Sequence, residues 1–407
     1  MDKHVKKDKY FILFLLLVSF VMFAFNYDGG VSGYNATLLG LTYANGILPR
    51  AFVGSIYYLM NGIMPFDLYT YGNVQIFTFI ATTLFIIFWC LLAYYFIKKT
   101  GRDYASYLEY IIVFVTLFVI GSFTSFFNYG RLDMYIAALT ILATLILVSN
   151  KCEWLVIPIS IVCVLIHEGY VFMYYNVILV IVLYKLIRAH INNDKSLRTK
   201  YIIIFAVSLI CVSLIFGYYT FVYNGNEGAY ESTLNLAKHL TYNEDYHKEV
   251  IRAEVLGENL FKEEWNRYHI GNIIELVFFL ILFLPFLIIQ GKVISRLIKT
   301  ADNILNKWQY IIFAIGAATT LPLFILKVDF GRWILSVIVY YCLVMIALIA
   351  MNDKGARRVW AEEIDYIRSK TSYGKLLLVY AMLFVPLLDV NICNVTGKML
   401  DVVERLI

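Results

Sequence analysis

The chain has 407 residues, of which 61% are hydrophobic and 15% are charged, and its formal net charge at pH 7 is +5. Soluble domains are about 45–50% apolar and about 25% charged, so this composition excludes a soluble protein and indicates a polytopic membrane protein. The positive charge requires no nucleic acid as a partner, because basic residues beside membrane spans set their orientation. The six cysteines lack metal-ligand spacing, and we expect neither a metal site nor a cofactor.

Apolar runs divide the chain into eleven predicted membrane-spanning helices, which form one all-α polytopic domain over residues 1–407. A span needs about 20 apolar residues, within a range of about 17–25. By this measure the spans cover approximately residues 10–27, 73–97, 107–127, 134–150, 154–166, 170–187, 201–222, 271–290, 309–326, 333–351 and 376–393.

The fifth and sixth runs are separated by His167, Glu168 and Gly169 alone. A single helix over 154–187 would be about 50 Å long, whereas the hydrocarbon core is about 30 Å thick. One span here would also invert every later loop and reverse the distribution of basic residues. We therefore predict a helix break at His167-Glu168-Gly169.

The distribution of lysine and arginine predicts the orientation of the chain. With the N-terminus in the cytoplasm and the C-terminus on the outer side, 23 of the 34 basic residues flank the spans on the cytoplasmic side. This bias is the one that the positive-inside rule describes.

Two long segments are then predicted on the outer side. Residues 28–72 contain a semi-apolar stretch over 51–64, which is too short to span and suits an interfacial helix. Residues 223–269 are rich in acidic side chains, and the apolar positions within 247–268 have the spacing of an amphipathic helix on the membrane.

Two ionisable residues stand out in the first outer segment. Asp28 follows the first span in an Asp-Gly-Gly sequence, and Arg50 precedes the stretch over 51–64. A guanidinium at Arg50 can bind a phosphate or diphosphate. Simpler interpretations are a turn carboxylate for Asp28 and a snorkelling membrane anchor for Arg50.

Two predicted helix N-termini carry a Gly-Arg pair and an aspartate. Arg131 and Asp133 open the fourth span, and Asp329 and Arg332 open the tenth. Helix N-termini attract anions and disfavour cations, so arginines at these positions require an anionic partner. The alternative for each aspartate is an ordinary helix N-cap.

His167 and Glu168 lie side by side at the predicted break. They combine a group that titrates near neutrality with a carboxylate, which suits proton transfer. The alternative is a purely structural break that contains a hydrogen-bonded histidine.

These residue types suit group transfer from a phosphate-activated lipid. A diphosphate leaving group needs cations as its charge develops, and an acceptor hydroxyl needs a base within hydrogen-bond reach. The sequence shows no soluble nucleotide-binding domain. A membrane-borne donor, such as a polyprenyl-linked sugar, is therefore expected.

The layout of the spans, the Gly-Arg pair at the fourth span, the broken hairpin with His167 and the Asp-Phe-Gly-Arg-Trp motif at 329–333 resemble the Wzy and EpsG type of bacterial polysaccharide polymerase. The resemblance implies a GT-C-like membrane glycosyltransferase that joins oligosaccharide repeats carried on undecaprenyl diphosphate. Its product would be an O-antigen, a capsule or another surface polysaccharide, made at the outer face of the bacterial plasma membrane. The acidic segment 223–269 departs from the family, whose large loop often carries an arginine motif.

The resemblance also implies partners and two groups of site residues. The partners are the undecaprenyl-diphosphate-linked glycan, membrane lipid, a flippase and a chain-length regulator. The residues that would hold the diphosphate are Arg131, Arg332 and Arg50. The residues that would activate or position the acceptor hydroxyl are His167, Glu168, Asp133 and Asp329.

Other classes of membrane protein remain as alternatives. A GT-C-type glycosyltransferase with a polyprenyl monophosphate donor would use Asp28 as its base, but Asp28 lacks the acidic neighbour that is common there. A lipid-linked glycan transporter would need basic residues inside its spans, and the sequence places none deep in a span. An O-acyltransferase would need polar residues on the cytoplasmic side, where this chain has few to spare.

Overall fold

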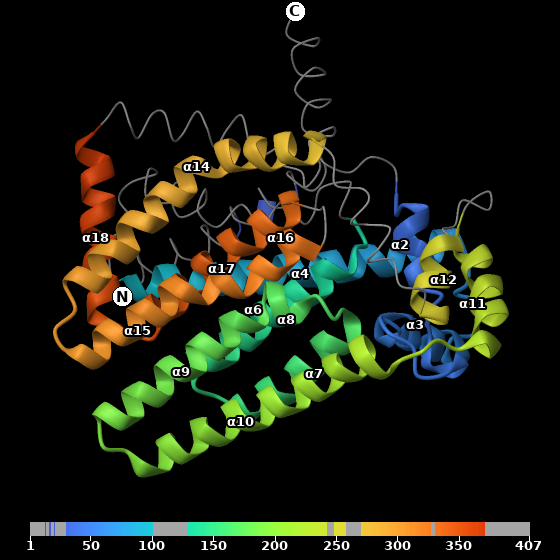
Figure 1. Ribbon diagram of the computed structural model, residues 1–407, viewed down its shortest axis with the longest axis horizontal. Helices are drawn as coiled ribbons and strands as arrows, with labels where there is room; N and C mark the ends of the chain where they lie inside the picture. Colours follow the sequence, from blue (N-terminus) through green and yellow to red (C-terminus); the bar gives the residue numbers. More distant parts are fainter. Residues whose placement is uncertain are drawn as a thin grey trace, which may run out of the picture.

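The computed structural model of the chain (Figure 1) describes residues 30–100, 129–241, 248–257, 270–326 and 330–370, together with four positions between 13 and 20. All regular secondary structure within these residues is helical, as the composition predicts. The predicted spans at 107–127 and 376–393, and nearly all of the span at 10–27, lie outside the described residues.

The longer helices in the described residues form a bundle, and shorter ones cover one of its ends (Figure 1). The α-helices are α2 (Gly33–Leu38), α3 (Phe52–Ile63), α4 (Tyr71–Thr100), α6 (Leu132–Ser149), α7 (Val156–Ile166), α8 (Tyr170–Met173), α9 (Tyr175–Ile191), α10 (Lys195–Gly217), α11 (Glu227–Leu240), α12 (Lys248–Leu256), α14 (Ile270–Lys299), α15 (Ile304–Ile315), α16 (Leu321–Leu326), α17 (Phe330–Ala350) and α18 (Lys354–Ser369). Short 3-10 or π turns are η1 (Tyr43–Asn45), η4 (Glu153–Leu155), η5 (Tyr218–Val222) and η6 (Gly316–Thr320).

Polar residues in the connections start several of these helices. Asp194, Asn226, Asn303 and Asp353 are N-caps, and each side chain accepts a hydrogen bond from the backbone N–H three residues further on. Such side chains satisfy a donor that the first helical turn leaves unpaired. The sequence thus fixes where α10, α11, α15 and α18 begin.

Five helical segments of the described residues are long and apolar enough to cross a membrane: Tyr71–Leu92, Leu132–Ser149, Lys195–Val222, Ile304–Ile325 and Phe330–Ala350. They match the predicted spans at 73–97, 134–150, 201–222, 309–326 and 333–351. The two parts of α14, bent by 52°, make a sixth if they are taken as one span. Pro285 lies inside α14, and a proline removes one helical hydrogen bond and favours such a bend. The total of eleven spans stays a prediction.

The most buried span is α17, which packs against α4, α6, α9 and α14. Within its membrane-length window 89% of residues are buried, against 22% for Lys195–Val222. An apolar helix that other helices surround belongs to the core, whereas an apolar helix with exposed side chains suits contact with lipid. The difference in burial therefore places α17 at the centre of the bundle and α10 at its periphery.

The predicted break between the fifth and sixth runs is present. α7 ends at Ile166, His167 is extended with φ −158° and ψ 121°, and α8 covers four residues before a second interruption at Tyr174. α9 then runs from Tyr175 to Ile191. His167 and Glu168 consequently lie in irregular backbone at one end of the bundle.

That end of the bundle, which we call the loop end, is covered by α2, α3, α11 and α12 (Figure 1). α3 occupies the predicted stretch over 51–64 and exposes apolar side chains including Leu59 and Ile63. α12 is shorter than the helix predicted over 247–268: it ends at Leu256, where Gly257 adopts φ +66°. A glycine in this conformation commonly terminates a helix. Residues 258–268 lie outside the described part of the chain.

Candidate functional site

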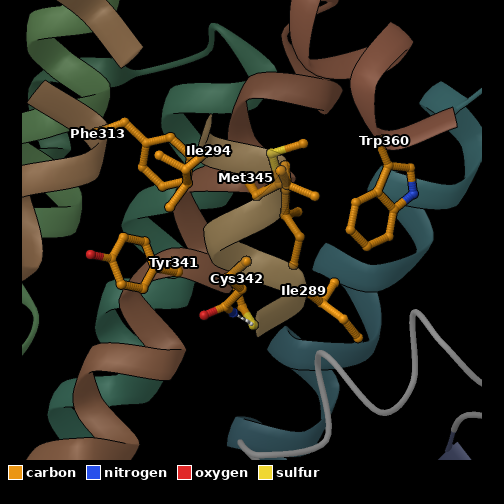
Figure 2. Close-up of a pocket in the computed structure, with 10 residues that line it drawn as sticks. Ile289, Ile294, Phe313, Tyr341, Cys342, Met345 and Trp360 are labelled. Carbon is orange, nitrogen blue, oxygen red and sulfur yellow. Dashed lines mark hydrogen bonds between the residues drawn. The ribbon is translucent and has the colours of Figure 1, made fainter. Parts of the chain in front are cut away.

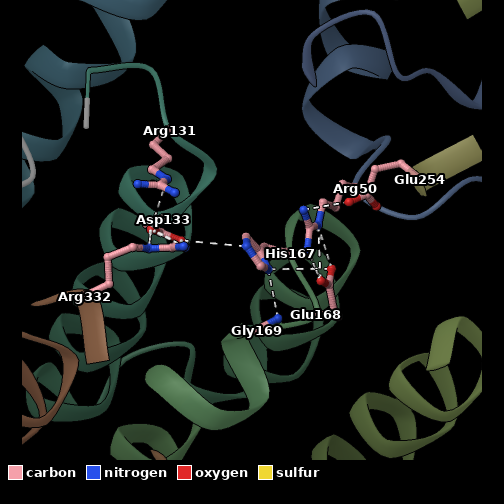
Figure 3. Close-up of polar contacts among 8 residues, drawn as sticks. All are labelled: Arg50, Arg131, Asp133, His167, Glu168, Gly169, Glu254 and Arg332. Atoms are coloured by element: carbon pink, nitrogen blue, oxygen red, sulfur yellow. Dashed lines mark hydrogen bonds and ion pairs between the residues drawn. The ribbon is translucent and has the colours of Figure 1, made fainter. Parts of the chain in front are cut away.

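Six of the residues singled out from the sequence meet at the loop end, together with one that was not (Figure 3). We call this set the polar cluster. Its members are Arg50, Arg131, Asp133, His167, Glu168, Glu254 and Arg332. Asp28 and Asp329 lie outside the described residues.

Arg332 and Asp133 form a two-pronged ion pair between the first turns of α17 and α6. Arg332 Nε donates to Asp133 Oδ2 at 2.8 Å, and Arg332 Nη2 donates to Asp133 Oδ1 at 2.9 Å. The side chains are only 9% and 1% exposed, so few waters compete for these bonds. The interpretation of Asp133 as the N-cap is wrong, because Arg131 holds the N-cap position of α6.

Arg131 lies at the edge of the same pair. Its Nε is 3.9 Å from Asp133 Oδ2, and its guanidinium carbon is 5.8 Å from the centre of the Tyr34 ring. The preceding Gly130 has φ +83°, which glycine adopts without strain and which turns the chain into α6. The turn at Gly130 and the N-cap position of Arg131 on α6 place the Arg131 side chain near Asp133.

Arg50 is held between two carboxylates from distant segments. Its Nε donates to Glu168 Oε2 at 3.0 Å, its Nη2 contacts Glu168 Oε1, and its Nη1 lies 2.7 Å from Glu254 Oε1. Burial opposes the charged form of Arg50, but the two carboxylates outweigh it and raise its pKa. The same pairing outweighs burial at Glu168 and lowers its pKa. Arg50 therefore binds protein carboxylates and is not a free snorkelling anchor.

The backbone of Arg50 also has an unusual conformation. Its φ is +58°, a left-handed value that costs free energy in a residue with a side chain. The neighbouring Leu48 and Ala51 are completely buried, so packing on both sides holds the residue in place. Strain of this kind is concentrated at functional sites.

His167 lies between the two ion-paired groups (Figure 3). The Gly169 N–H donates to His167 Nδ1 at 2.9 Å, whereas His167 Nε2 is 3.9 Å from Asp133 Oδ1. Because Nδ1 accepts a hydrogen bond, the proton of the neutral ring is assigned to Nε2. Burial lowers the pKa of His167 to about 4, despite the opposing effect of Glu168. At neutral pH the ring is an uncharged donor.

Glu254 is the member of the cluster that sequence reasoning missed. It lies on α12, within the acidic segment 223–269, and its Oε1 pairs with Arg50 Nη1. A carboxylate on the polar side of an amphipathic helix carries no local signal of a partner about two hundred residues away. The pairing emerges only when α12 packs on α2 and α11.

The charges of the polar cluster balance within the described residues. Three guanidinium groups face three carboxylates, and His167 is neutral. An anionic ligand that binds one of these arginines would compete with its carboxylate, and a carboxylate that loses its arginine becomes a stronger base. No group of three or more His, Cys, Asp or Glu residues in the described ranges is arranged to hold a metal ion.

A pocket between α14 and α17 has a different character (Figure 2). Its lining includes Ile289, Val293, Phe313, Met345 and Trp360 and contains no charged side chain. The polar contact inside it joins Gln290 Nε2 to Cys342 Sγ at 3.1 Å. Such a lining can hold an apolar group but offers neither cations nor a base, so the polar cluster is the candidate site for chemistry.

The fold and the site together define an all-helical protein with membrane-length apolar helices and a charge-balanced polar cluster at one end. Comparison with protein-family models, with curated proteins and with solved structures finds no match to this chain. The resemblance to polysaccharide polymerases therefore rests on the residues described above.

Proposed function

We propose that the protein is a polymerase that joins undecaprenyl-diphosphate-linked oligosaccharide repeats at the outer face of the bacterial plasma membrane. The observation that carries the proposal is the meeting of three arginines, three carboxylates and a histidine at one end of a bundle of membrane-length helices. A lipid-linked diphosphate offers an anionic group at membrane depth, which such a cluster suits.

The chemistry requires cations and a base at the same place. The acceptor hydroxyl oxygen forms a bond to the anomeric carbon, the bond from that carbon to the diphosphate oxygen breaks, and the diphosphate leaves with the bonding electrons. Arg131, Arg332 and Arg50 would bind the diphosphate and stabilise its developing charge. The proton of the acceptor hydroxyl passes to a carboxylate that the arginines have released.

The geometry favours a carboxylate over His167 as that base. The Nδ1 lone pair of His167 already accepts the Gly169 N–H, and Nε2 carries the proton, so the ring has no free acceptor. Asp133 and Glu168 each regain basicity when a diphosphate takes their arginine. His167 would then donate a hydrogen bond and position one of these groups, and Asp329 stays a predicted contributor.

The decisive experiment is an analysis of cell-surface polysaccharide in a strain that lacks the gene, with and without the wild-type copy restored. A polymerase predicts that single lipid-linked repeats accumulate on the outer side and that long polymer returns on complementation. Repeats that lack one sugar would instead identify a glycosyltransferase of the Asp28 type. Complete repeats retained on the cytoplasmic side would identify a transporter, and either result would refute the proposal.

A further inference from the structure

α18 forms part of the wall of the apolar pocket between α14 and α17, at the end of the bundle opposite the loop end (Figure 1). Trp360 of α18 lines this pocket together with Ile289 of α14 and Met345 of α17 (Figure 2). Ala356, Val359 and Trp360 share one face of their helix, and the first two are completely buried. α18 therefore turns its apolar side to the bundle and completes the pocket wall.

Basic side chains follow the pocket along both helices. On α14, Arg296 and Lys299 come three and six residues after the pocket residue Val293, which is about 5–9 Å further along the helix axis. On α18, Nη2 of Arg358 donates a hydrogen bond to the Thr300 carbonyl at 3.1 Å. This bond brings Arg358 to the end of α14 that carries Lys299, so the three cations gather beside the pocket.

These cations keep donors for a further anion. Arg296 Nη1 lies 3.2 Å from the buried carboxylate of Glu363, while the Arg296 side chain is 38% exposed. Lys299 and Arg358 are exposed residues. A guanidinium has five N–H donors and an ammonium has three, so the contacts to Glu363 and to the Thr300 carbonyl use only part of this capacity.

The charges of α18 are divided unevenly along the helix. Its first five residues include three basic side chains, and its acidic side chains come in its second half: Lys354, Arg357 and Arg358, then Glu362, Glu363 and Asp365. The helix dipole favours the reverse order, so this arrangement does not serve the stability of α18 itself. It creates a positive region where α18 meets the end of α14.

An apolar pocket with cations one or two turns away matches the two parts of a phospholipid. The acyl chains are apolar, and the phosphate lies at the glycerol end, beyond the hydrocarbon. Basic pockets between membrane-length helices on the cytoplasmic side bind anionic headgroups, and the distribution of lysine and arginine predicts this end of the bundle on that side. A choline headgroup carries its own cation beside the phosphate, so the positive region favours an anionic lipid.

We propose that an anionic phospholipid binds between α14 and α18, with part of an acyl chain against the apolar pocket and its headgroup phosphate at Arg296, Lys299 and Arg358. We call this the lipid site. It contains no residue of the polar cluster, so it is a second ligand site that does not depend on the proposed reaction. The bound lipid would connect α18 to α14.

Fluorescence quenching by brominated lipid tests the lipid site directly. The full-length protein is placed in phosphatidylcholine nanodiscs with a minor fraction of brominated phosphatidylglycerol or, in parallel, of brominated phosphatidylcholine. Bromine quenches a tryptophan that it approaches closely, and the difference from Trp360→Phe isolates the fluorescence of Trp360. We expect brominated phosphatidylglycerol to quench Trp360 at an about tenfold lower fraction than brominated phosphatidylcholine.

Lys299→Gln/Arg358→Gln removes two of the cations and should make the two brominated lipids quench equally. Arg296 stays in place, because its removal would leave the buried Glu363 without this counter-charge. The matched control is Lys195→Gln/Arg198→Gln, which removes the same charge from the first turn of α10, at the same end of the bundle (Figure 1). This control should keep the preference for phosphatidylglycerol.

A third variant separates charge from structure. Lys299→Arg/Arg358→Lys keeps both charges and should keep the preference for phosphatidylglycerol. Equal quenching of wild-type Trp360 by the two lipids would overturn the lipid site. An equal loss of preference in the control would also overturn it, because a general attraction of anionic lipid to this end would then explain the result. Loss in Lys299→Arg/Arg358→Lys would show that the cations do not bind the headgroup through their charge, with the same consequence.

Discussion

At the end of the bundle opposite the polar cluster, Glu153 contacts the ammonium groups of Lys185 and Lys200 and accepts a hydrogen bond from Tyr201. Lys185 also donates to the Leu147 carbonyl and to Asn150. Asn150 follows the last residue of α6, whereas Asp133 lies in the first turn of the same helix. The two charged groups are thus separated by the length of α6, about 27 Å.

A second buried acid completes this opposite-end network. Asp353 accepts hydrogen bonds from Tyr184 and Tyr310, both at 2.8 Å, pairs with Arg188 and caps α18. All of these contacts are within hydrogen-bonding range. A buried acid surrounded in this way has no capacity left for a ligand, so the opposite-end network is structural.

The polar cluster is built differently. One group is the Arg332–Asp133 pair and the other is Arg50 with Glu168 and Glu254, and each contains short ion-pair contacts. His167, which lies between the groups, is 3.9 Å from Asp133 and 3.6 Å from Glu168. Arg131 is also 3.9 Å from Asp133. The Glu168 side chain is 28% exposed. The same residue types therefore serve packing where every hydrogen bond is made, and they could serve a ligand where the contacts between them are long.

The largest effect should follow from breaking the opposite-end network. Glu153→Gln leaves the buried ammonium of Lys185 without its full counter-charge, and we expect a loss of about 3 kcal/mol in the free energy of unfolding. Polymer formation per folded molecule should be unchanged. Thermal unfolding of the purified protein measures the first quantity and polymer yield per inserted protein the second. Partial recovery of stability in Glu153→Gln/Lys185→Met would confirm the pairing, and a selective loss of polymer would contradict the structural role.

Charge removal in the polar cluster should instead leave stability nearly unchanged and reduce polymer formation. Arg131→Gln breaks a long contact, so the free energy of unfolding should fall by about 1 kcal/mol or less. Polymer formation should fall about 100-fold, the usual loss when one stabiliser of developing charge is removed. Lys200→Gln, an equal charge change at the opposite end, serves as the control and should make normal polymer. Wild-type polymer lengths in Arg131→Gln would remove Arg131 from the proposed site.

These two patterns also show what the sequence can and cannot predict. The break at His167 and the starts of α6 and α17 follow from helix length and from residues adjacent in the chain, so their polar residues were predictable. The pairing of Arg332 with Asp133 joins residues 199 positions apart and depends on which helices pack together. Periodicity within each helix carries no information about that choice.

Because the sequence does not show which distant residues pair, it also assigns incomplete roles to several charged residues. The sequence assigns the basic residues near the predicted cytoplasmic ends of spans, Lys185, Arg188 and Lys200 among them, only a role in orientation, because their acidic partners lie in other segments. In the loop end, arginines and carboxylates were given separate tasks, whereas the structure pairs them with each other. Glu254 and the helix α11 were not anticipated, since the weakly apolar sequence of residues 227–240 lacks the signal of a buried helix.

The neutral state of His167 predicts how stability depends on pH. Its pKa in the folded protein is about 4, below the ordinary value of about 6.5, so the folded state binds fewer protons. The contribution of neutral His167 to the free energy of unfolding is complete above pH 6.5 and is lost as the pH falls towards 4. At pH 5 the loss should be on the order of 2 kcal/mol.

A comparison of variants isolates this contribution. The difference in thermal stability between pH 7 and pH 5 should be smaller in His167→Gln than in the wild type. His190→Gln, at an exposed position of the opposite end, should retain the wild-type difference. An equal response in both variants would mean that His167 is not held neutral by its surroundings.

The smallest effect tests whether the position of His167 matters at all. Gly169 has φ −58°, which alanine tolerates, but an added Cβ would lie 2.9 Å from His167 Cε1 and 3.0 Å from Nδ1. Gly169→Ala should therefore shift the ring by a few tenths of an ångström and lengthen the bond to Nδ1. We expect polymer formation to fall about fivefold, with a change in unfolding free energy of about 1 kcal/mol or less.

Gly62→Ala is the matched control, because an added Cβ on this glycine of α3 meets no atom within 4 Å. It should leave polymer formation at the wild-type level. If Gly169→Ala also makes normal polymer, the placement of the ring has no role in the reaction, and His167 is a structural residue of the helix break, as Asp353 is of the opposite end. A loss confined to Gly169→Ala would show that the placement of the His167 ring matters to the reaction.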